Sequence, residues 1–120
     1  MGKFRDGTID GVILRPLKKF SDPRGWLCEL FRSDNGLWPG GGDFRPEMAY
    51  FSMTRPGVMR GPHAHREQTD YFCFIGPSTF QLAIWDDRPA SPTCGNRQVV
   101  ACGEANLLLA VVPPLVVHAY

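Results

Sequence analysis

Short apolar runs, interrupted by glycine and proline along the whole chain, are the feature that most restricts its fold. Thirteen glycines and eleven prolines make up a fifth of the 120 residues, and they separate the runs instead of forming one tract. No segment of ten or more residues keeps the helical spacing of apolar side chains. Turn residues at intervals of roughly 8–12 positions are typical of all-β sandwiches and barrels. We therefore expect one all-β domain of about eight or nine short strands.

Eight runs combine strand-forming residues with turn residues at their ends. They cover residues 12–15, 26–31, 47–54, 69–75, 79–85, 97–101, 107–112 and 116–120. The turn Gly76-Pro77-Ser78 predicts that 69–75 and 79–85 pair as a hairpin. Residues 58–65 are expected to be extended, and the glycine-rich segment 33–46 is expected to be a mobile loop.

Composition excludes several classes of function. Lys and Arg number 13 against 12 Asp and Glu, without a basic run, so we expect no binding to nucleic acid. The longest apolar run, 107–112, is far shorter than the roughly 20 residues that span a bilayer. The N-terminus lacks the apolar segment of a secretory signal. The four cysteines form no CxxC pair, so we expect reduced thiols and a cytoplasmic location.

All three histidines of the chain fall in two short segments. His63 and His65 are two positions apart, so in an extended segment both side chains point to one face. Asp70 begins the next predicted strand, and His118 follows a Pro-Pro turn near the C-terminus. Three imidazoles and a carboxylate suit a divalent transition metal, and histidine also suits proton transfer near neutral pH. Both alternatives are open at this point.

The spacing of these residues resembles the two motifs of the cupin superfamily. Gly57, His63, His65, Asp70 and Gly76 follow the order of the first motif, with Asp where cupins usually have Glu. Residues 113–118, Pro-x-Leu-x-x-His, resemble the second motif. The resemblance implies a double-stranded β-helix, which is a jelly-roll barrel.

A longer resemblance, from about Gly11 to the end, is to the dTDP-4-dehydrorhamnose 3,5-epimerase family. These enzymes are cupin-fold homodimers that need no metal and invert carbons beside the keto group of a dTDP-4-keto-6-deoxy sugar. The resemblance implies an isomerase of nucleotide-sugar metabolism without a cofactor. The matching motifs are Asp22-Pro-Arg-Gly25 with Glu29 and Phe31, Ser52-x-Thr54-x-x-Gly57-Val58-Met59-Arg60-Gly61-x-His63, Trp85-Asp-Asp-Arg88 with Ser91-Pro92-Thr93, and Pro113-Pro114 with His118-Ala-Tyr120.

The resemblance implies a role for each matching residue. His63 matches the base that removes the proton beside the carbonyl, and His118 matches a histidine of the pocket. Arg60 matches an arginine at the sugar nucleotide. Arg24 and Glu29 match residues that hold the nucleotide, often across the dimer interface, so residues 1–32 are expected to contribute to dimer contacts.

Two departures from the family bear on the chemistry. Asp70 stands where the family has a lysine that stabilises the enolate, and a carboxylate cannot do so without a proton or a metal. Asp70 could also orient a histidine and raise its pKa, as part of a catalytic set with His63 and His118. The family's acid tyrosine and orienting aspartate lie beyond Tyr120, so we expect that this chain is truncated.

Three hypotheses follow. The first is a sugar-nucleotide epimerase or isomerase, in which His65 joins the substrate-binding residues; the His-Ala-His sequence also resembles the sugar-nucleotide 3,4-ketoisomerases. The second is a cupin with other chemistry and a metal held by His63, His65, Asp70 and His118. The third is a sugar-binding cupin without catalysis.

Overall fold

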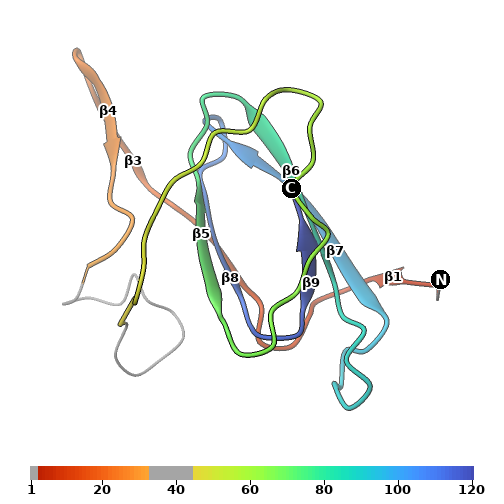
Figure 1. Ribbon diagram of the computed structural model, residues 1–120. Helices are drawn as coiled ribbons and strands as arrows, with labels where there is room; N and C mark the ends of the chain where they lie inside the picture. The colour runs from red at the N-terminus through yellow and green to blue at the C-terminus, as the bar shows by residue number, and fades with distance from the viewer. Residues whose placement is uncertain (1–2, 33–44) are drawn as a thin grey trace.

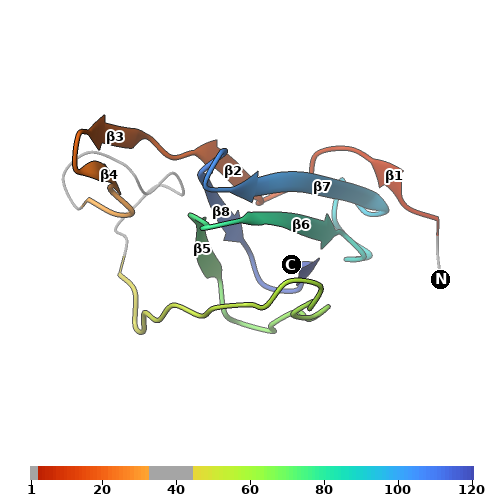
Figure 2. The ribbon, with the colours of Figure 1, turned by 90° about the horizontal axis from the view of Figure 1, so that it is seen from above.

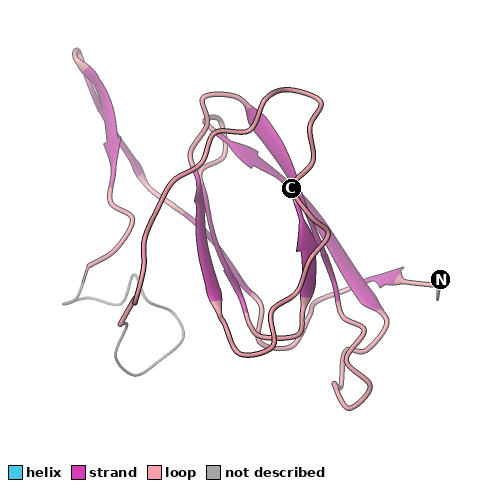
Figure 3. Ribbon diagram, viewed as in Figure 1, coloured by secondary structure: helices cyan, strands magenta, loops and turns pink. Residues whose placement is uncertain are grey.

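The computed structural model describes residues 3–32 and 45–120. Strands supply all the regular structure of these residues (Figure 3), and no helix in them is long and apolar enough to cross a membrane. Most of the expected mobile loop, residues 33–46, lies outside the described residues, which resume at position 45. In chain order the strands are β1 (Arg5–Asp6), β2 (Ile13–Pro16), β3 (Lys19–Asp22), β4 (Gly25–Cys28), β5 (Asp70–Phe74), β6 (Thr79–Trp85), β7 (Asn96–Gly103), β8 (Leu108–Val112) and β9 (Val117–Ala119).

Two sheets face each other and enclose the core. One sheet has the strand order β1-β7-β6-β9 and the other has the order β2-β8-β5. Figure 1 shows them as the two sides of a barrel, with β5 and β8 opposite β6, β7 and β9. The hairpin of β3 and β4 stands off one end, and β1 lies at the other end (Figures 1 and 2). The expected all-β jelly-roll barrel is confirmed.

Strand β8 is buried on both of its faces, which explains why its sequence is wholly apolar. It is the central strand of its sheet, between β2 and β5. Leu108, Ala110 and Val112 face the barrel interior and pack with Leu82 and Ile84 of β6. The alternate side chains enter a second cluster on the outer face of the sheet, with Leu17 and Leu107. A strand covered on both faces needs no polar alternation.

The expected hairpin between 69–75 and 79–85 is wrong. Strand β5 pairs with β8, whereas β6 pairs with β7 and β9 in the opposite sheet. The connecting turn instead crosses from one sheet to the other, as consecutive strands of a jelly roll do. Gly76 has φ of +104° there, and a Cβ at this position would lie 2.8 Å from the side chain of Glu104. The turn residues identify a change of direction, but they do not identify the partner strand.

Two further strand predictions are corrected. Residues 47–54 form no strand, and their large apolar side chains are exposed, with Phe51 at 99% and Tyr50 at 76%. Apolar alternation predicts which face a strand would bury, but here no strand of the described chain lies alongside to complete a ladder. The strand predicted at 26–31 ends at Cys28, so Glu29 lies beyond it.

Candidate functional site

Segment 60–65 lies antiparallel to the C-terminal residues and positions two of the histidines. Arg60 exchanges two backbone hydrogen bonds with Tyr120, at 2.6 and 3.0 Å, and His63 exchanges two with His118, both at 3.0 Å. Between these pairs, Gly61 and Pro62 stand opposite the single residue Ala119. Two residues opposite one make a β-bulge, which redirects the side chains that follow it.

Gly61 makes this bulge possible. Its φ is +95°, and an added Cβ would lie 2.7 Å from the backbone oxygen of His118. The position therefore favours glycine both for its conformation and for the close approach of the neighbouring backbone. The bulge directs His63 towards a cavity, and His65, two residues later, lines the same cavity.

Asp70 and His118 enter the site from opposite sheets. Asp70 is the first residue of β5 and shares the inward face with Phe72 and Phe74, which pack in or against the main core. His118 lies in the middle of β9, 1% exposed, with its ring edge-on to Phe72 at 5.5 Å. The structure brings the two histidine segments together, with the ligand atoms of the three histidines within 4.8 Å of one another. His63 and His65 line the cavity, whereas His118 is buried beside them.

The carboxylate of Asp70 lies between two imidazoles. Its Oδ2 lies 3.1 Å from Nε2 of His65 and 3.1 Å from Nε2 of His118. The amide of Gln68 donates to the other oxygen, Oδ1, at 2.5 Å. The ring of His63 meets the ring of His118 edge-on, with centroids 4.6 Å apart. The four side chains form one compact cluster.

The protonation of His118 is restricted by its surroundings. Its Nδ1 lies 3.1 Å from the backbone oxygen of Val116, and because a carbonyl oxygen only accepts, Nδ1 bears the proton. Burial lowers the pKa of His118 below its usual value; the Val116 carbonyl opposes this shift and the neighbouring His63 adds to it. A neutral His118 therefore presents the lone pair of Nε2 towards Asp70.

The cluster lies at a cavity of about 560 Å³, within the size range of small-molecule sites. Arg60 lines it and is held by hydrogen bonds to Thr54 Oγ1 at 2.7 Å and to the backbone oxygen of Met53 at 2.9 Å. These bonds use two of the five N–H donors of a guanidinium. The residues that line the cavity are Tyr50, Ser52, Met59, Arg60, Gly61, His63, His65, Gln68, Asp70, Phe72 and Tyr120.

The other predicted binding residues lie apart from this cavity. Arg24 sits at the turn of the β3–β4 hairpin, where it pairs with Asp22 at 2.7 Å and its side chain is 89% exposed. Glu29 follows β4 and pairs with Arg32 at 3.3 Å. Neither residue lines the histidine cavity of its own chain. Their predicted role in holding a nucleotide stays a prediction.

Sequence reasoning missed two residues of the site. Gln68 orients Asp70 through its amide, and it lies two positions before Asp70 in the sequence. Tyr120 lines the cavity, and burial raises the pKa of its hydroxyl. The alternation of a strand could have identified Tyr120, because it lies two residues after His118 and so shares its face. Nothing in the sequence distinguished Gln68 from an ordinary loop residue.

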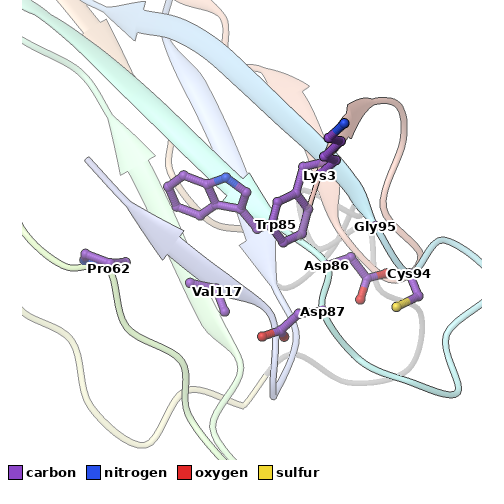
Figure 4. A pocket seen from close by; sticks show the side chains of 9 residues that line it. Lys3, Pro62, Trp85, Asp86, Asp87, Cys94, Gly95 and Val117 are labelled. Carbon is purple, nitrogen blue, oxygen red and sulfur yellow. The ribbon is translucent and has the colours of Figure 1, made fainter. Parts of the chain in front are cut away.

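A second cavity, of about 480 Å³, lies on the outer side of the sheet that contains β6 and β9 (Figure 4). Trp85 and Val117, from neighbouring strands, line it with Phe4 and Pro62. Its carboxylates are those of Asp87 and of Asp86, whose side chain is already held by hydrogen bonds to Arg88. No histidine lines it among the described residues. Of these two cavities, the first is the one lined by described histidines, and it is therefore the candidate site.

Three described imidazoles could contribute to a metal site. The ligand atoms of His63, His65 and His118 all lie within 4.8 Å of one another. Asp70 adds a carboxylate oxygen at 3.1 Å from two of them. The donor types therefore fit a divalent transition metal, and the same groups are able to transfer protons.

Comparison with known proteins identifies the family. Residues 6–120 match the family described as dTDP-4-dehydrorhamnose 3,5-epimerase. The chain is 42% identical over 108 residues to the probable low-salt glycan biosynthesis epimerase Agl13 of Haloferax volcanii, a match that covers 88% of this chain and 65% of that protein. It is 37% identical over 112 residues to the spore coat polysaccharide biosynthesis protein SpsL of Bacillus subtilis, covering 93% and 70%.

A solved structure agrees. The dTDP-4-dehydrorhamnose 3,5-epimerase of Sulfolobus tokodaii superposes with a TM-score of 0.77 at 27% identity, over 95% of this chain and 65% of that one. The expected cupin-type jelly roll is confirmed by this likeness. The chain thus spans about two thirds of the length of the proteins that it matches. The chain belongs to the dTDP-4-dehydrorhamnose 3,5-epimerase family.

Proposed function

We propose that this chain is a sugar-nucleotide epimerase that transfers protons at the carbons beside the keto group of a dTDP-4-keto-6-deoxy sugar. The observation that supports this most is the cluster of three imidazoles and one carboxylate at a cavity that also contains Arg60. The relatives from Haloferax volcanii and Sulfolobus tokodaii are both named as epimerases. In this proposal the nucleotide sugar is the substrate, and the reaction needs no cofactor.

His63 is the base in this proposal. It is exposed and lines the cavity, and its backbone is held by the hydrogen bonds to His118. A base must come within hydrogen-bonding reach of the proton that it removes, and a side chain open to the cavity satisfies this condition. His118 lies directly behind His63, with centroids 4.6 Å apart, and supports its ring. Asp70 orients His65 through its Oδ2, and the Val116 carbonyl orients His118 through Nδ1.

Arg60 and His65 bind the substrate in this proposal. A guanidinium matches the geometry of phosphate oxygens and keeps its charge at every working pH. The bonds to Thr54 and Met53 fix its orientation beside the cavity, which lowers the entropy lost when it binds an anion. Tyr120 adds a hydroxyl at the same cavity.

Arg24 and Glu29 would act in a homodimer. Both lie on or after the β3–β4 hairpin, which stands away from the barrel (Figures 1 and 2). A projecting hairpin of one subunit is able to reach a neighbouring subunit's cavity, which is how residues distant within one chain could contact the nucleotide. The single cupin domain, the dimer contacts of residues 1–32 and the cytoplasmic location complete the proposal.

Solvent exchange tests the function directly. The chain is incubated in D₂O with a dTDP-4-keto-6-deoxy sugar, and deuterium beside the keto group is followed by NMR or mass spectrometry. We expect incorporation, and His63→Asn should slow it by about 100- to 10,000-fold, the usual contribution of a general base. Glu67→Gln, an exposed change outside the cavity lining, is the control and should exchange like the wild type.

Absence of exchange with the folded wild-type chain would contradict the proposal. It would favour the sugar-binding cupin without catalysis, provided that the same sugar nucleotide binds in a calorimetric titration. Unchanged exchange in His63→Asn would show that another group is the base. Circular dichroism of each variant establishes that a loss of exchange is not a loss of fold.

A further inference from the structure

Removal of a proton beside a keto group leaves negative charge on the keto oxygen. When His63 takes the proton, the electron pair of the C–H bond forms a C=C bond, and the π pair of the carbonyl moves onto oxygen. The resulting enolate is stabilised by a hydrogen-bond donor or a positive charge that is already in place. Asp70 lines the cavity but supplies neither, because an ionised carboxylate only accepts hydrogen bonds.

The positive charge of the cavity is needed at a different part of the substrate. Arg60 is the one Lys or Arg side chain among the described residues that line the cavity, and it binds the diphosphate in the proposed function. In a dTDP-4-keto sugar the diphosphate is attached to C1, whereas the keto group is C4, across the ring. Hydrogen bonds to Thr54 and Met53 also fix the direction of the guanidinium. The keto oxygen therefore needs a separate donor.

Tyr120 differs from the other neutral donors at the cavity. Gln68 and His65 both face the carboxylate of Asp70, the first as a donor at 2.5 Å and the second at 3.1 Å. The two other hydroxyls among the described lining residues belong to segment 47–54, which forms no strand and exposes both of these side chains. Tyr120 is the partly buried hydroxyl of the described lining.

The ring of Tyr120 is held on several sides. Its backbone exchanges two hydrogen bonds with Arg60, at 2.6 and 3.0 Å. Its ring packs edge-on against Phe72 and Phe74, with centroids 5.4 and 5.3 Å apart. The hydroxyl forms a hydrogen bond with Ser52, another residue of the cavity. A donor fixed in this way stabilises a new charge without having to reorient first.

The hydroxyl of Tyr120 also keeps a proton to donate. A phenol in water has a pKa near 10. Burial raises the pKa of Tyr120 and Tyr50 adds to this rise, whereas Arg60 and Ser52 oppose it. The Ser52 hydroxyl is able to rotate and donate to the phenolic oxygen, which leaves the phenolic hydrogen for a third atom.

We propose that the hydroxyl of Tyr120 donates a hydrogen bond to the keto oxygen of the substrate and stabilises the enolate that forms when His63 acts. The inference rests on the proposed function and makes Tyr120 a catalytic residue. The phenolic proton stays on Tyr120 throughout the reaction. The carbon regains a proton from the protonated His63 or from solvent, so the step is balanced without an oxidant or a cofactor.

The change Tyr120→Phe tests this role, because it removes the hydroxyl and keeps the ring. Deuterium exchange at saturating substrate should fall by about 100- to 1,000-fold, the usual effect of losing one oxyanion donor. The dissociation constant for dTDP, measured by calorimetric titration, should not change. Tyr71→Phe is the matched control: it removes the same atom from a tyrosine of β5 that bonds to Leu30 and does not line the cavity. It should exchange like the wild type.

A second measurement observes the hydrogen bond without turnover. The sugar nucleotide is labelled with ¹³C at the keto carbon and bound to His63→Asn, which holds it unreacted. A hydrogen bond to the keto oxygen moves the resonance of the keto carbon downfield. We expect this downfield shift in His63→Asn and in His63→Asn/Tyr71→Phe, and its loss in His63→Asn/Tyr120→Phe.

The outcomes separate this inference from the proposed function. Exchange by Tyr120→Phe at the wild-type rate overturns the role of Tyr120, while exchange by the wild type still supports the proposed function. Loss of dTDP affinity together with exchange shows a structural role and also overturns the inference. If the wild type does not exchange but the keto-carbon shift depends on Tyr120, the proposed function fails and the contact stands. If neither is observed, both are refuted.

Discussion

The buried carboxylate of Asp86 offers the most direct test of how this barrel is held together. Its side chain is fully buried and accepts five hydrogen bonds. Three come from Arg88, through the backbone N–H at 3.2 Å and the guanidinium at 2.8 and 3.0 Å, and one each from Ser91 and Thr93 at 2.6 Å. Arg88 and Thr93 also bond to the backbone of Asp10, so the cluster joins the N-terminal segment to the loop after β6.

The change Asp86→Asn should lower the free energy of unfolding by about 3–5 kcal/mol, the usual cost of removing one partner of a buried ion pair. The amide keeps the shape of the carboxylate but loses its charge and turns one acceptor into a donor. The hydroxyls of Ser91 and Thr93 are able to rotate and accept from the new NH₂ group. The guanidinium of Arg88 cannot accept, so most of the loss falls on this pair.

Urea unfolding followed by tryptophan fluorescence measures the effect, since Trp85 precedes Asp86 directly. Asp87→Asn is a matched control: the neighbouring carboxylate is exposed, and its replacement should change stability by less than about 0.5 kcal/mol. If the free energies of unfolding of Asp86→Asn and the wild type differed by less than about 1 kcal/mol, the buried network would not stabilise the fold as argued.

The pH dependence of this difference has a definite sign. The hydrogen bonds from Arg88 hold the pKa of Asp86 well below its usual value. A carboxylate with a lowered folded-state pKa contributes stability that is complete above the unfolded-state pKa, near 4, and is lost as pH falls below it. The free energy of unfolding of the wild type should therefore exceed that of Asp86→Asn by the full difference at pH 7, and this difference should narrow below about pH 4. A difference that grew on acidification would contradict the assignment.

Other variants test the site and the core. Gly61→Ala should destabilise the fold by about 1–3 kcal/mol and slow deuterium exchange into the substrate, because the added Cβ would lie 2.7 Å from the backbone oxygen of His118. Gly57 also has a positive φ, but an added Cβ there would meet nothing within 4 Å. Gly57→Ala should therefore lower the free energy of unfolding by less, as urea unfolding would show. Leu82→Ala should cost about 2–5 kcal/mol, because its side chain is fully buried in the core, and equal stability in urea would refute that role. Arg60→Gln should weaken dTDP binding in a calorimetric titration while leaving the urea midpoint unchanged.

The strands of the second half could be predicted from sequence because local pattern and tertiary role agree there. β8 is apolar throughout since both faces are covered, and β6 alternates since one face reaches the core. The pairing of β5 could not be predicted in the same way. Its partner β8 lies more than thirty residues away, and the sequence of a turn does not report which sheet the next strand enters.

The exposed segment 47–54 shows the opposite case. Its sequence predicts a strand, yet Met48, Tyr50 and Met53 are all more than 70% exposed. Alternation indicates that one face of a segment is suited to burial, whereas a strand also needs a neighbouring strand that supplies hydrogen bonds. That neighbour is a property of the whole assembly of elements and cannot be read from eight residues.

Part of the site follows from local sequence pattern and part depends on the whole fold, and Asp70 shows the difference. Period-two alternation places Asp70 on the inward face of β5, and the spacing of His63 and His65 places both on one face. Neither pattern predicts that one oxygen of Asp70 lies 3.1 Å from two imidazole nitrogens that come from segments about fifty residues apart. The direction of the His118 lone pair depends on the Val116 carbonyl, which is set by the backbone of the turn before β9. The residue types therefore restrict the chemistry of the site to proton transfer or metal binding. The hydrogen bond of His118 to one backbone carbonyl then determines which of its ring nitrogens is available for either process.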